Sequence, residues 1–276
     1  MGKSEARALG TSEAEEYESH GFLVFDPQIG AGTIDRAVAR LKEMYLAEGA
    51  PDDRSGELVA FRNNRRVQDA WKVIPEVKAI ATAPRVLQLL RDLYRCRPLP
   101  FQTLNFRMGS EQQPHSDTIH FNSRPAGFMC GVWVALEDID SDNGPVVYFP
   151  GSHKWSEATL TDVDAFGTRG WLQRRASQVR GYVNAFRDTD ADYAKYERLI
   201  RDRIAASGIS PHYATIKKGQ AFIWAANLVH GGSHHADRAR SRASQVTHYF
   251  FEGCRYYTPL LRRGLKTRWR NPDWIA

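Results

Sequence analysis

Two candidate metal ligands stand two positions apart in the segment Gln113-Pro-His-Ser-Asp117. Residues i and i+2 of an extended stretch point to the same side, so His115 and Asp117 can present an imidazole and a carboxylate to one metal ion. A third ligand must come from elsewhere in the chain. His230 is the best candidate, because it follows an apolar run and precedes two glycines that allow close approach. Two histidines and one carboxylate on one face of a metal are typical of non-haem iron(II) oxygenases.

A candidate cosubstrate arginine lies downstream of this set. His-x-Asp tripeptides arise often by chance, and the chain has nine histidines, so a second feature is needed. Arg242 begins a predicted strand and shares a face with Ser244, Val246 and His248. If that face lines the interior, the buried guanidinium needs a carboxylate partner. No acidic residue in the strand can serve, whereas 2-oxoglutarate can chelate iron with one end and bind the arginine with the other. Arg240 has the same parity and is the nearest rival.

The elements that must position these residues fall into an early helical part and a later part rich in strands. Caps and apolar spacing predict helices over residues 11–20, 33–47, 84–94 and 193–206. Short aromatic and β-branched runs between turn residues predict strands over residues 22–25, 101–106, 128–136, 146–149, 214–216, 221–224 and 244–251.

A highly charged stretch, residues 155–210, interrupts the strands, and we interpret it as an insertion that carries helices. The chain has no internal repeat and no clear linker. Helices followed by strands, with one insertion, predict a single, mainly β domain: a sandwich or barrel with helices against one side.

Over nearly its whole length, the sequence resembles the phytanoyl-CoA dioxygenase family of iron(II)- and 2-oxoglutarate-dependent oxygenases. Several motifs match in the family's order and spacing. They are Glu15–Phe25, the His-x-Asp at 115–117, Val132–Leu136, Asn143–Pro145, Pro150–Lys154, His230–Gly232 and the strand containing Arg242. The resemblance implies a double-stranded β-helix (jelly-roll or cupin-like) with the iron site at its open end. The core would cover about residues 99–154 and 212–252 of one domain, 1–276, with the helical insertion at about 155–211.

The resemblance also implies roles that spacing alone would leave unassigned. Trp133 falls where the family has a tryptophan beside the cosubstrate. Gln102 and Leu104 share the face of the first core strand that lines the 2-oxoglutarate pocket. Arg66 matches a basic residue that can reach the same pocket.

The sequence departs from the family's pattern just after the distal histidine. The family's serine two positions after that histidine is Gly232 here, and the stretch from His230 to the arginine is one residue longer. This leaves Arg240 open as the cosubstrate arginine, although the spacing from Arg242 to His248 favours Arg242.

The implied reaction uses iron(II), 2-oxoglutarate and dioxygen to oxidise a C–H group, with succinate and CO2 as co-products. The carboxylate of Asp117 argues for hydroxylation, desaturation or ring formation, because related halogenases replace it with a small residue. The insertion and the segment 50–70 are the places where a lid could form, although a solvated helical insertion is an equally good interpretation of residues 155–210. Four arginines and four aromatic residues of the insertion suit an anionic or ring-containing small molecule: Arg174, Arg175, Arg180, Arg187, Trp155, Trp171, Tyr182 and Phe186. His120 and Trp155 are the candidate substrate contacts.

Composition sets the broad class. Hydrophobic residues make up 42% and charged residues 25%, as in soluble globular proteins. No apolar run is long enough to span a bilayer and the N-terminal residues lack the apolar core of a secretory signal, so a cytoplasmic protein is expected. The three cysteines form no disulfide framework. The oligomeric state is left open.

The net charge of +6 includes a basic C-terminal cluster: Arg262, Arg263, Lys266, Arg268 and Arg270. Such a cluster can attract anionic partners but is more often a solvated face, and no nucleic-acid-binding module is visible. Three alternatives remain open: another metal-dependent cupin-type enzyme such as an isomerase or hydrolase, a non-catalytic binding protein on the same barrel, and a basic protein of nucleic-acid or membrane surfaces.

Overall fold

The computed structural model describes residues 11–46, 62–63, 66–167, 175–176, 188–261 and 266–276. Within these ranges, all strand pairs are antiparallel and form three sheets. The major sheet has the order β1 (Phe22–Phe25), β9 (Ala221–Ala225), β6 (Met129–Ala135), β11 (Ser244–Phe251), β4 (Pro98–Phe106), β3 (Arg66–Gln68), β2 (Arg62–Asn63). The minor sheet has the order β10 (His230–Gly232), β7 (Val146–Tyr148), β8 (His212–Ala214), and β12 (Arg255–Tyr257) pairs with β5 (Asn122–Arg124).

The major sheet is buried on both faces, as the alternation along β6 shows. Val132 and Val134 pack with the N-terminal helices in one core cluster. Trp133 and Ala135 point the other way, into a second cluster that includes Val146 and Tyr148 of the minor sheet. Because successive side chains of a strand point to opposite faces, the two sheets enclose the second cluster between them.

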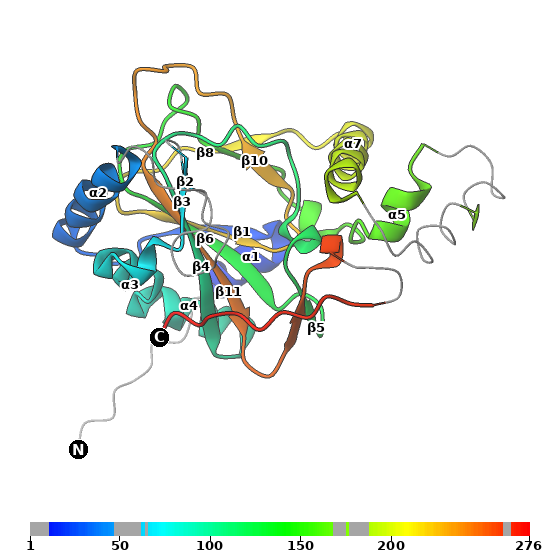
Figure 1. Cartoon of the computed structure of the whole chain (residues 1–276), viewed down its shortest axis with the longest axis horizontal. Helices are drawn as coiled ribbons and strands as arrows, with labels where there is room; N and C mark the ends of the chain where they lie inside the picture. Colours follow the sequence, from blue (N-terminus) through cyan, green and yellow to red (C-terminus); the bar gives the residue numbers. More distant parts are fainter. Residues whose placement is uncertain (1–10, 47–61, 64–65, 168–174, 177–187, 262–265) are drawn as a thin grey trace.

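Two groups of helices flank this core (Figure 1). α1 (Thr11–His20), α2 (Ala31–Leu46), α3 (Pro75–Ala81) and α4 (Pro84–Tyr94) come from the N-terminal part, and the last three gather on one side of the major sheet. α5 (Leu160–Ala165) and α7 (Thr189–Ser207) lie together at the opposite end of the molecule. They pack on Val147, Phe149 and Val229 in a separate apolar cluster.

Most of the predicted elements are confirmed, four of them with the predicted ends and the others with shifted ends. The predicted strand over residues 214–216 is wrong, because β8 ends at Ala214. Helix α3, which begins at Pro75, was not predicted. Much of the expected lid and several of its residues lie outside the described residues, namely Arg174, Arg180, Arg187, Trp171, Tyr182 and Phe186, as do Arg262 and Arg263. Within the described ranges, no helix is both long and apolar enough to cross a membrane.

Candidate metal centre

The two candidate histidine ligands lie side by side because their backbones form an antiparallel bridge. The His115 N–H donates to the His230 carbonyl at 2.8 Å, and the His230 N–H donates to the His115 carbonyl at 2.9 Å. Their ring centroids are 4.7 Å apart. Two residues later, Asp117 begins the short 3-10 helix η2 (Asp117–Ile119), and this turn of the chain brings its carboxylate to the imidazole pair.

These three side chains could hold one metal ion. Asp117 Oδ1 lies 3.8 Å from His115 Nε2 and 3.9 Å from His230 Nε2. Both separations are less than twice a usual metal–ligand distance of about 2.1 Å, so one ion can reach all three atoms. All three residues are buried, and they form the one group of potential ligand residues found within the described ranges.

The hydrogen bonds of the two imidazoles prepare them for a metal. His115 Nδ1 lies 2.9 Å from the Gln113 carbonyl oxygen, and His230 Nδ1 lies 3.1 Å from that of Leu228. Because a carbonyl oxygen only accepts hydrogen bonds, each Nδ1 carries the proton and each Nε2 offers a lone pair. Burial also lowers the pKa of His115 to about 3, which keeps that ring neutral.

The carboxylate of Asp117 is fixed by an indole. Trp224 Nε1 donates to Asp117 Oδ2 at 2.7 Å, which leaves Oδ1 facing the histidines. Burial opposes ionisation of Asp117, but the neighbouring imidazoles and this N–H outweigh it and hold the pKa below its usual value. Gly131 makes room for the indole, because a Cβ there would lie 2.3 Å from Trp224 Cζ2.

At the other end of the same cavity, two buried donors lack partners among the described residues. Arg242 is 3% exposed, and its Nη1 donates to Ser244 Oγ at 2.8 Å. Its Nε and the Nε1 of Trp133 are buried without a hydrogen bond. Burial lowers the pKa of Arg242 to about 10, so it is still cationic at neutral pH. Since buried donors are normally satisfied, this end suits a carboxylate ligand.

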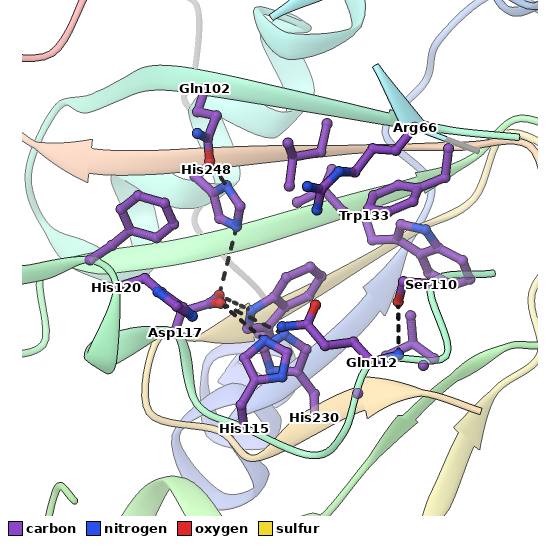
Figure 2. Close-up of a pocket in the computed structure, with 18 of the residues that line it drawn as sticks. Arg66, Gln102, Ser110, Gln112, His115, Asp117, His120, Trp133, His230 and His248 are labelled. Atoms are coloured by element: carbon purple, nitrogen blue, oxygen red, sulfur yellow. Dashed lines mark hydrogen bonds and ion pairs between the residues drawn. The ribbon is translucent and has the colours of Figure 1, made fainter. Parts of the chain in front are cut away.

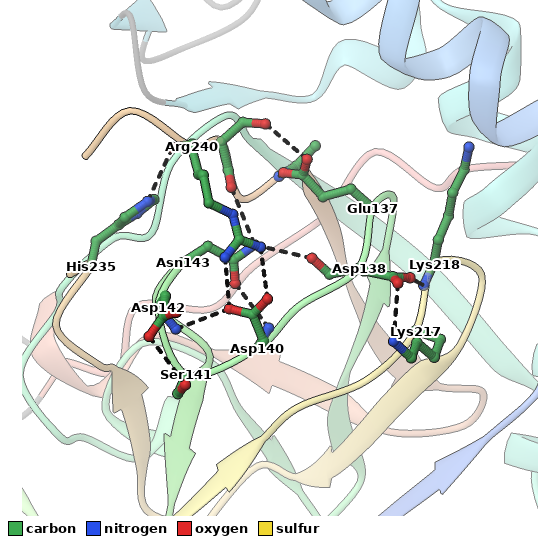
Figure 3. A network of polar contacts seen from close by, with 12 residues as sticks. Glu137, Asp138, Asp140, Ser141, Asp142, Asn143, Lys217, Lys218, His235 and Arg240 are labelled. Atoms are coloured by element: carbon green, nitrogen blue, oxygen red, sulfur yellow. Dashed lines mark hydrogen bonds and ion pairs between the residues drawn. The ribbon is translucent and has the colours of Figure 1, made fainter. Parts of the chain in front are cut away.

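The choice between the two arginines follows from the chain before β11. Arg240 makes a two-point ion pair with Asp140 at 3.0 and 2.7 Å, outside the cavity (Figure 3). Glu137 accepts from the Ser241 hydroxyl at 2.8 Å and from the Ala243 N–H. These contacts fix the segment, so Arg242 points into the cavity and Arg240 does not.

Other predicted site residues line the same cavity of about 310 Å³ (Figure 2). Gln102, Leu104, Arg66 and His120 all contribute to its wall. Trp155 does not, because it packs beside α5 and α7 in the apolar cluster under those helices.

Sequence reasoning gave no role to several lining residues. His248 Nε2 lies 3.8 Å from Asp117 Oδ2, and its Nδ1 lies 3.1 Å from Gln102 Oε1. Its shared face with Arg242 was a usable signal. Trp224 could have been placed by its alternation with Phe222, since both point inward from β9. Tyr193 of α7 carried no comparable signal.

A sequence model of the phytanoyl-CoA dioxygenase family matches residues 17–243. The chain belongs to this family. It is 25% identical over 191 residues to phytanoyl-CoA dioxygenase domain-containing protein 1 of Bos taurus, covering 52% of this chain and 66% of the relative. It is 42% identical over 170 residues to a probable phytanoyl-CoA dioxygenase of Caenorhabditis elegans, covering 54% of each chain. The chain spans 66%, 40% and 28% of the length of three curated relatives that it matches.

Solved structures of distant sequence share the fold and confirm the predicted double-stranded β-helix. EctD from S. alaskensis with 2-oxoglutarate and 5-hydroxyectoine superposes with a TM-score of 0.66 at 15% identity, covering 99% of this chain and 87% of EctD. The carbocyclase SnoK from nogalamycin biosynthesis gives a TM-score of 0.63 at 15% identity, covering 99% and 98%.

The predicted cofactors, iron and 2-oxoglutarate, are those found in solved structures of this fold. EctD has been solved with bound Fe and with 2-oxoglutarate, and the epimerase SnoN with Fe3+ and alpha ketoglutarate. The family member described here brings together a His–Asp–His group of the kind that holds such an iron.

Proposed function

We propose that the protein is an iron(II)- and 2-oxoglutarate-dependent dioxygenase that hydroxylates an unactivated C–H group of a small molecule. One observation carries the proposal: a buried His–Asp–His group shares a cavity with a buried arginine whose Nε has no partner among the described residues. When bound, iron and 2-oxoglutarate supply the oxidising chemistry, which releases succinate and CO2.

The chain's own residues would bind and orient these groups. His115, Asp117 and His230 hold the iron through Nε2, Oδ1 and Nε2. Arg242, oriented by Ser244, binds the distal carboxylate of 2-oxoglutarate, and the free Nε donates a second hydrogen bond.

Four further residues would shape the cosubstrate pocket. The Trp133 N–H points from β6 into the same end of the cavity and would donate to the cosubstrate. Gln102 and Leu104 form its wall from β4. Arg66 lies on β3, and burial lowers its pKa, so an anion nearby stabilises its charge.

The alternative, a cupin-type isomerase or hydrolase, assigns no role to the residues of the cosubstrate end. It would use the three metal ligands, yet leave the buried N–H groups of Arg242 and Trp133 without acceptors, which is costly. A binding protein without catalysis would not need the prepared Nε2 atoms of His115 and His230. The retained carboxylate of Asp117 favours hydroxylation over halogenation.

The substrate would enter beside His120, whose ring lies 5.0 Å from that of Tyr193. Gln112 and Phe121 complete this side of the cavity. These groups are neutral, but the guanidinium carbon of Arg270 lies 4.9 Å from the Phe121 ring centroid, so an anionic substrate would find a counter-charge on this side. Of the four arginines predicted to suit an anionic ligand, the structure describes Arg175, which is exposed.

The test is anaerobic titration of the protein with iron(II) and 2-oxoglutarate, followed by visible absorption. A weak metal-to-ligand charge-transfer band is expected, and the His115→Ala/Asp117→Ala double variant should lose it. A control variant, His212→Ala, changes an exposed histidine of β8 and should keep it. No band in the native protein, or a band that survives in the double variant, would refute the proposal. Product analysis after aerobic turnover would then separate hydroxylation from ring formation or epimerisation.

A further inference from the structure

Helix α7 contributes two tyrosines to the region of the metal centre, one turn apart. Residues three apart on a helix lie on the same side, and the rings of Tyr193 and Tyr196 are stacked at 5.9 Å and 21°. Asp188 fixes the start of the helix, because its side chain accepts from the N–H groups of Asp190 and Ala191. The helix is therefore a defined support for both rings.

Tyr196 binds the residue between two candidate metal ligands. The Ser116 N–H donates to the Tyr196 hydroxyl oxygen at 2.8 Å. That hydroxyl lies 3.2 Å from the Ser116 carbonyl oxygen and 3.3 Å from Ser116 Oγ, either of which can accept its proton. Tyr196 is fully buried, and Ser116 is 5% exposed. One side chain of α7 thus supplies a buried partner for the peptide that links His115 to Asp117.

Tyr193 holds the same segment on the other side of His115. Gln112 Nε2 donates to the Tyr193 hydroxyl at 3.0 Å. The next residue, Gln113, accepts the hydrogen bond from His115 Nδ1. The two tyrosines therefore attach α7 to the ligand segment both before and after His115.

The segment needs this support. Its backbone is bound to β10 at two places, through the bridge between His115 and His230 and through the Gly232 N–H, which donates to the Gln112 carbonyl at 2.9 Å. Within the described residues, no backbone hydrogen bond from a strand reaches Ser116 or Asp117. η2 begins only at Asp117. Small shifts of a ligand change metal geometry, and residues that orient ligands commonly alter metal affinity by about 10–100-fold when removed.

We propose that α7 is a positioning element of the metal centre, with Tyr196 as its principal residue and Tyr193 as a second anchor. This inference rests on the proposed function, because it takes His115 and Asp117 as metal ligands. The helix lies in the segment predicted to be an insertion, so that segment would set the geometry of the ligands as well as the wall of the cavity.

The experiment compares Tyr196→Phe with Tyr249→Phe in the full chain. Both tyrosines are buried, and each loses a hydroxyl that hydrogen-bonds to backbone: Tyr249 to the Ala81 carbonyl at 2.7 Å, away from the cavity. Cobalt(II) serves as the probe, because its visible d–d absorption reports ligand geometry and its titration gives an affinity. We expect Tyr196→Phe to weaken cobalt(II) binding by about 10–100-fold and to shift the d–d bands. We expect Tyr249→Phe to keep both.

Two other outcomes decide against the inference or its premise. Equal affinities and spectra for the two variants would overturn the positioning role while leaving the metal site intact. Failure of the native protein to bind cobalt(II) would instead refute the proposed function.

If Tyr196→Phe does not fold, Tyr193→Phe decides, because Tyr193 is only half-buried and its ring is retained. Loss of its hydrogen bond from Gln112 should weaken cobalt(II) binding by about threefold to tenfold. An unchanged affinity and spectrum in that variant would overturn the proposal.

Discussion

Replacing Arg242 by alanine should weaken binding of 2-oxoglutarate without changing metal affinity. The guanidinium carbon lies 5.4 Å from the ring centroids of both Trp133 and Phe106, and the side chain is almost fully buried. Charges attract strongly in such surroundings, because little water screens them. Removing one partner of a buried, hydrogen-bonded charge pair costs about 2–5 kcal/mol. At about 1.4 kcal/mol per tenfold change, the loss of affinity should be about 30-fold or more.

Thermal unfolding in the presence of iron(II) provides the assay. A ligand at about 100 times its Kd stabilises the native state by about 2.7 kcal/mol, or roughly 5–10 °C in Tm for a chain of this size. At the same concentration of 2-oxoglutarate, a variant with 100-fold weaker binding gains about 0.4 kcal/mol, and its Tm should barely move.

Arg240→Ala is the matched control, because its ion pair with Asp140 is solvent-exposed and such pairs contribute about 0–1 kcal/mol. It should keep the full response to 2-oxoglutarate. A normal response in Arg242→Ala, or an equal loss in both variants, would show that the buried guanidinium is not the carboxylate partner.

Two further predictions concern Asp117 and its neighbours. Trp224→Phe keeps an aromatic ring beside Asp117 but removes the N–H donor, so iron(II) affinity should fall by about 10–100-fold. The control is Trp274→Phe, at an exposed tryptophan, which should not change that affinity. Equal iron(II) affinities for the two variants would exclude the role of the indole. Burial lowers the pKa of His248 to about 4. Between about pH 6.5 and 4 the unfolded chain therefore binds one proton more at this residue than the native protein does. The free energy of unfolding should fall by roughly 3 kcal/mol as the pH falls through this window. Urea unfolding of metal-free protein at pH 7, 5.5 and 4 should show a smaller acid loss for His248→Gln, and identical pH dependence would contradict this.

Side chains of the site that lie on one element could be predicted from the sequence, because the residue period of a helix or strand decides which side chains share a face. Arg242 precedes β11 by two residues, yet it lines the same cavity as His248, as their shared parity predicts. Trp133 alternates with Val132 and Val134 as the predicted strand requires. The predicted strand over 244–251 is found with the same ends. Successive side chains of a strand point to opposite faces of the sheet, so odd and even positions can be assigned to one face or the other from the sequence.

Contacts that join distant segments were beyond that reasoning. The bridge joins His115, in the segment after β4, to His230, the first residue of β10. The sequence indicated both histidines as ligands of one metal, but it gave no sign that their backbones pair. The indole of Trp224 reaches Asp117 because Gly131, on the neighbouring strand, has no side chain. The shifted position of β8 has a similar origin, since its register is set by pairing with β7 rather than by its own residues.

Different elements form the cosubstrate end and the substrate side of the cavity, which affects how the substrate specificity of such an enzyme could change. The cosubstrate end is built on the major sheet, with Trp133 on β6, Leu104 on β4, and Arg242 two residues before β11, which pairs with both strands. The substrate side depends on α7, through Tyr193. If α7 only covered the cavity, its residues could vary freely with the substrate. The bond from Ser116 to Tyr196 argues otherwise, because a shift of the helix would also move the peptide between two metal ligands. Changes of substrate should therefore be easier at positions of the helix other than 196.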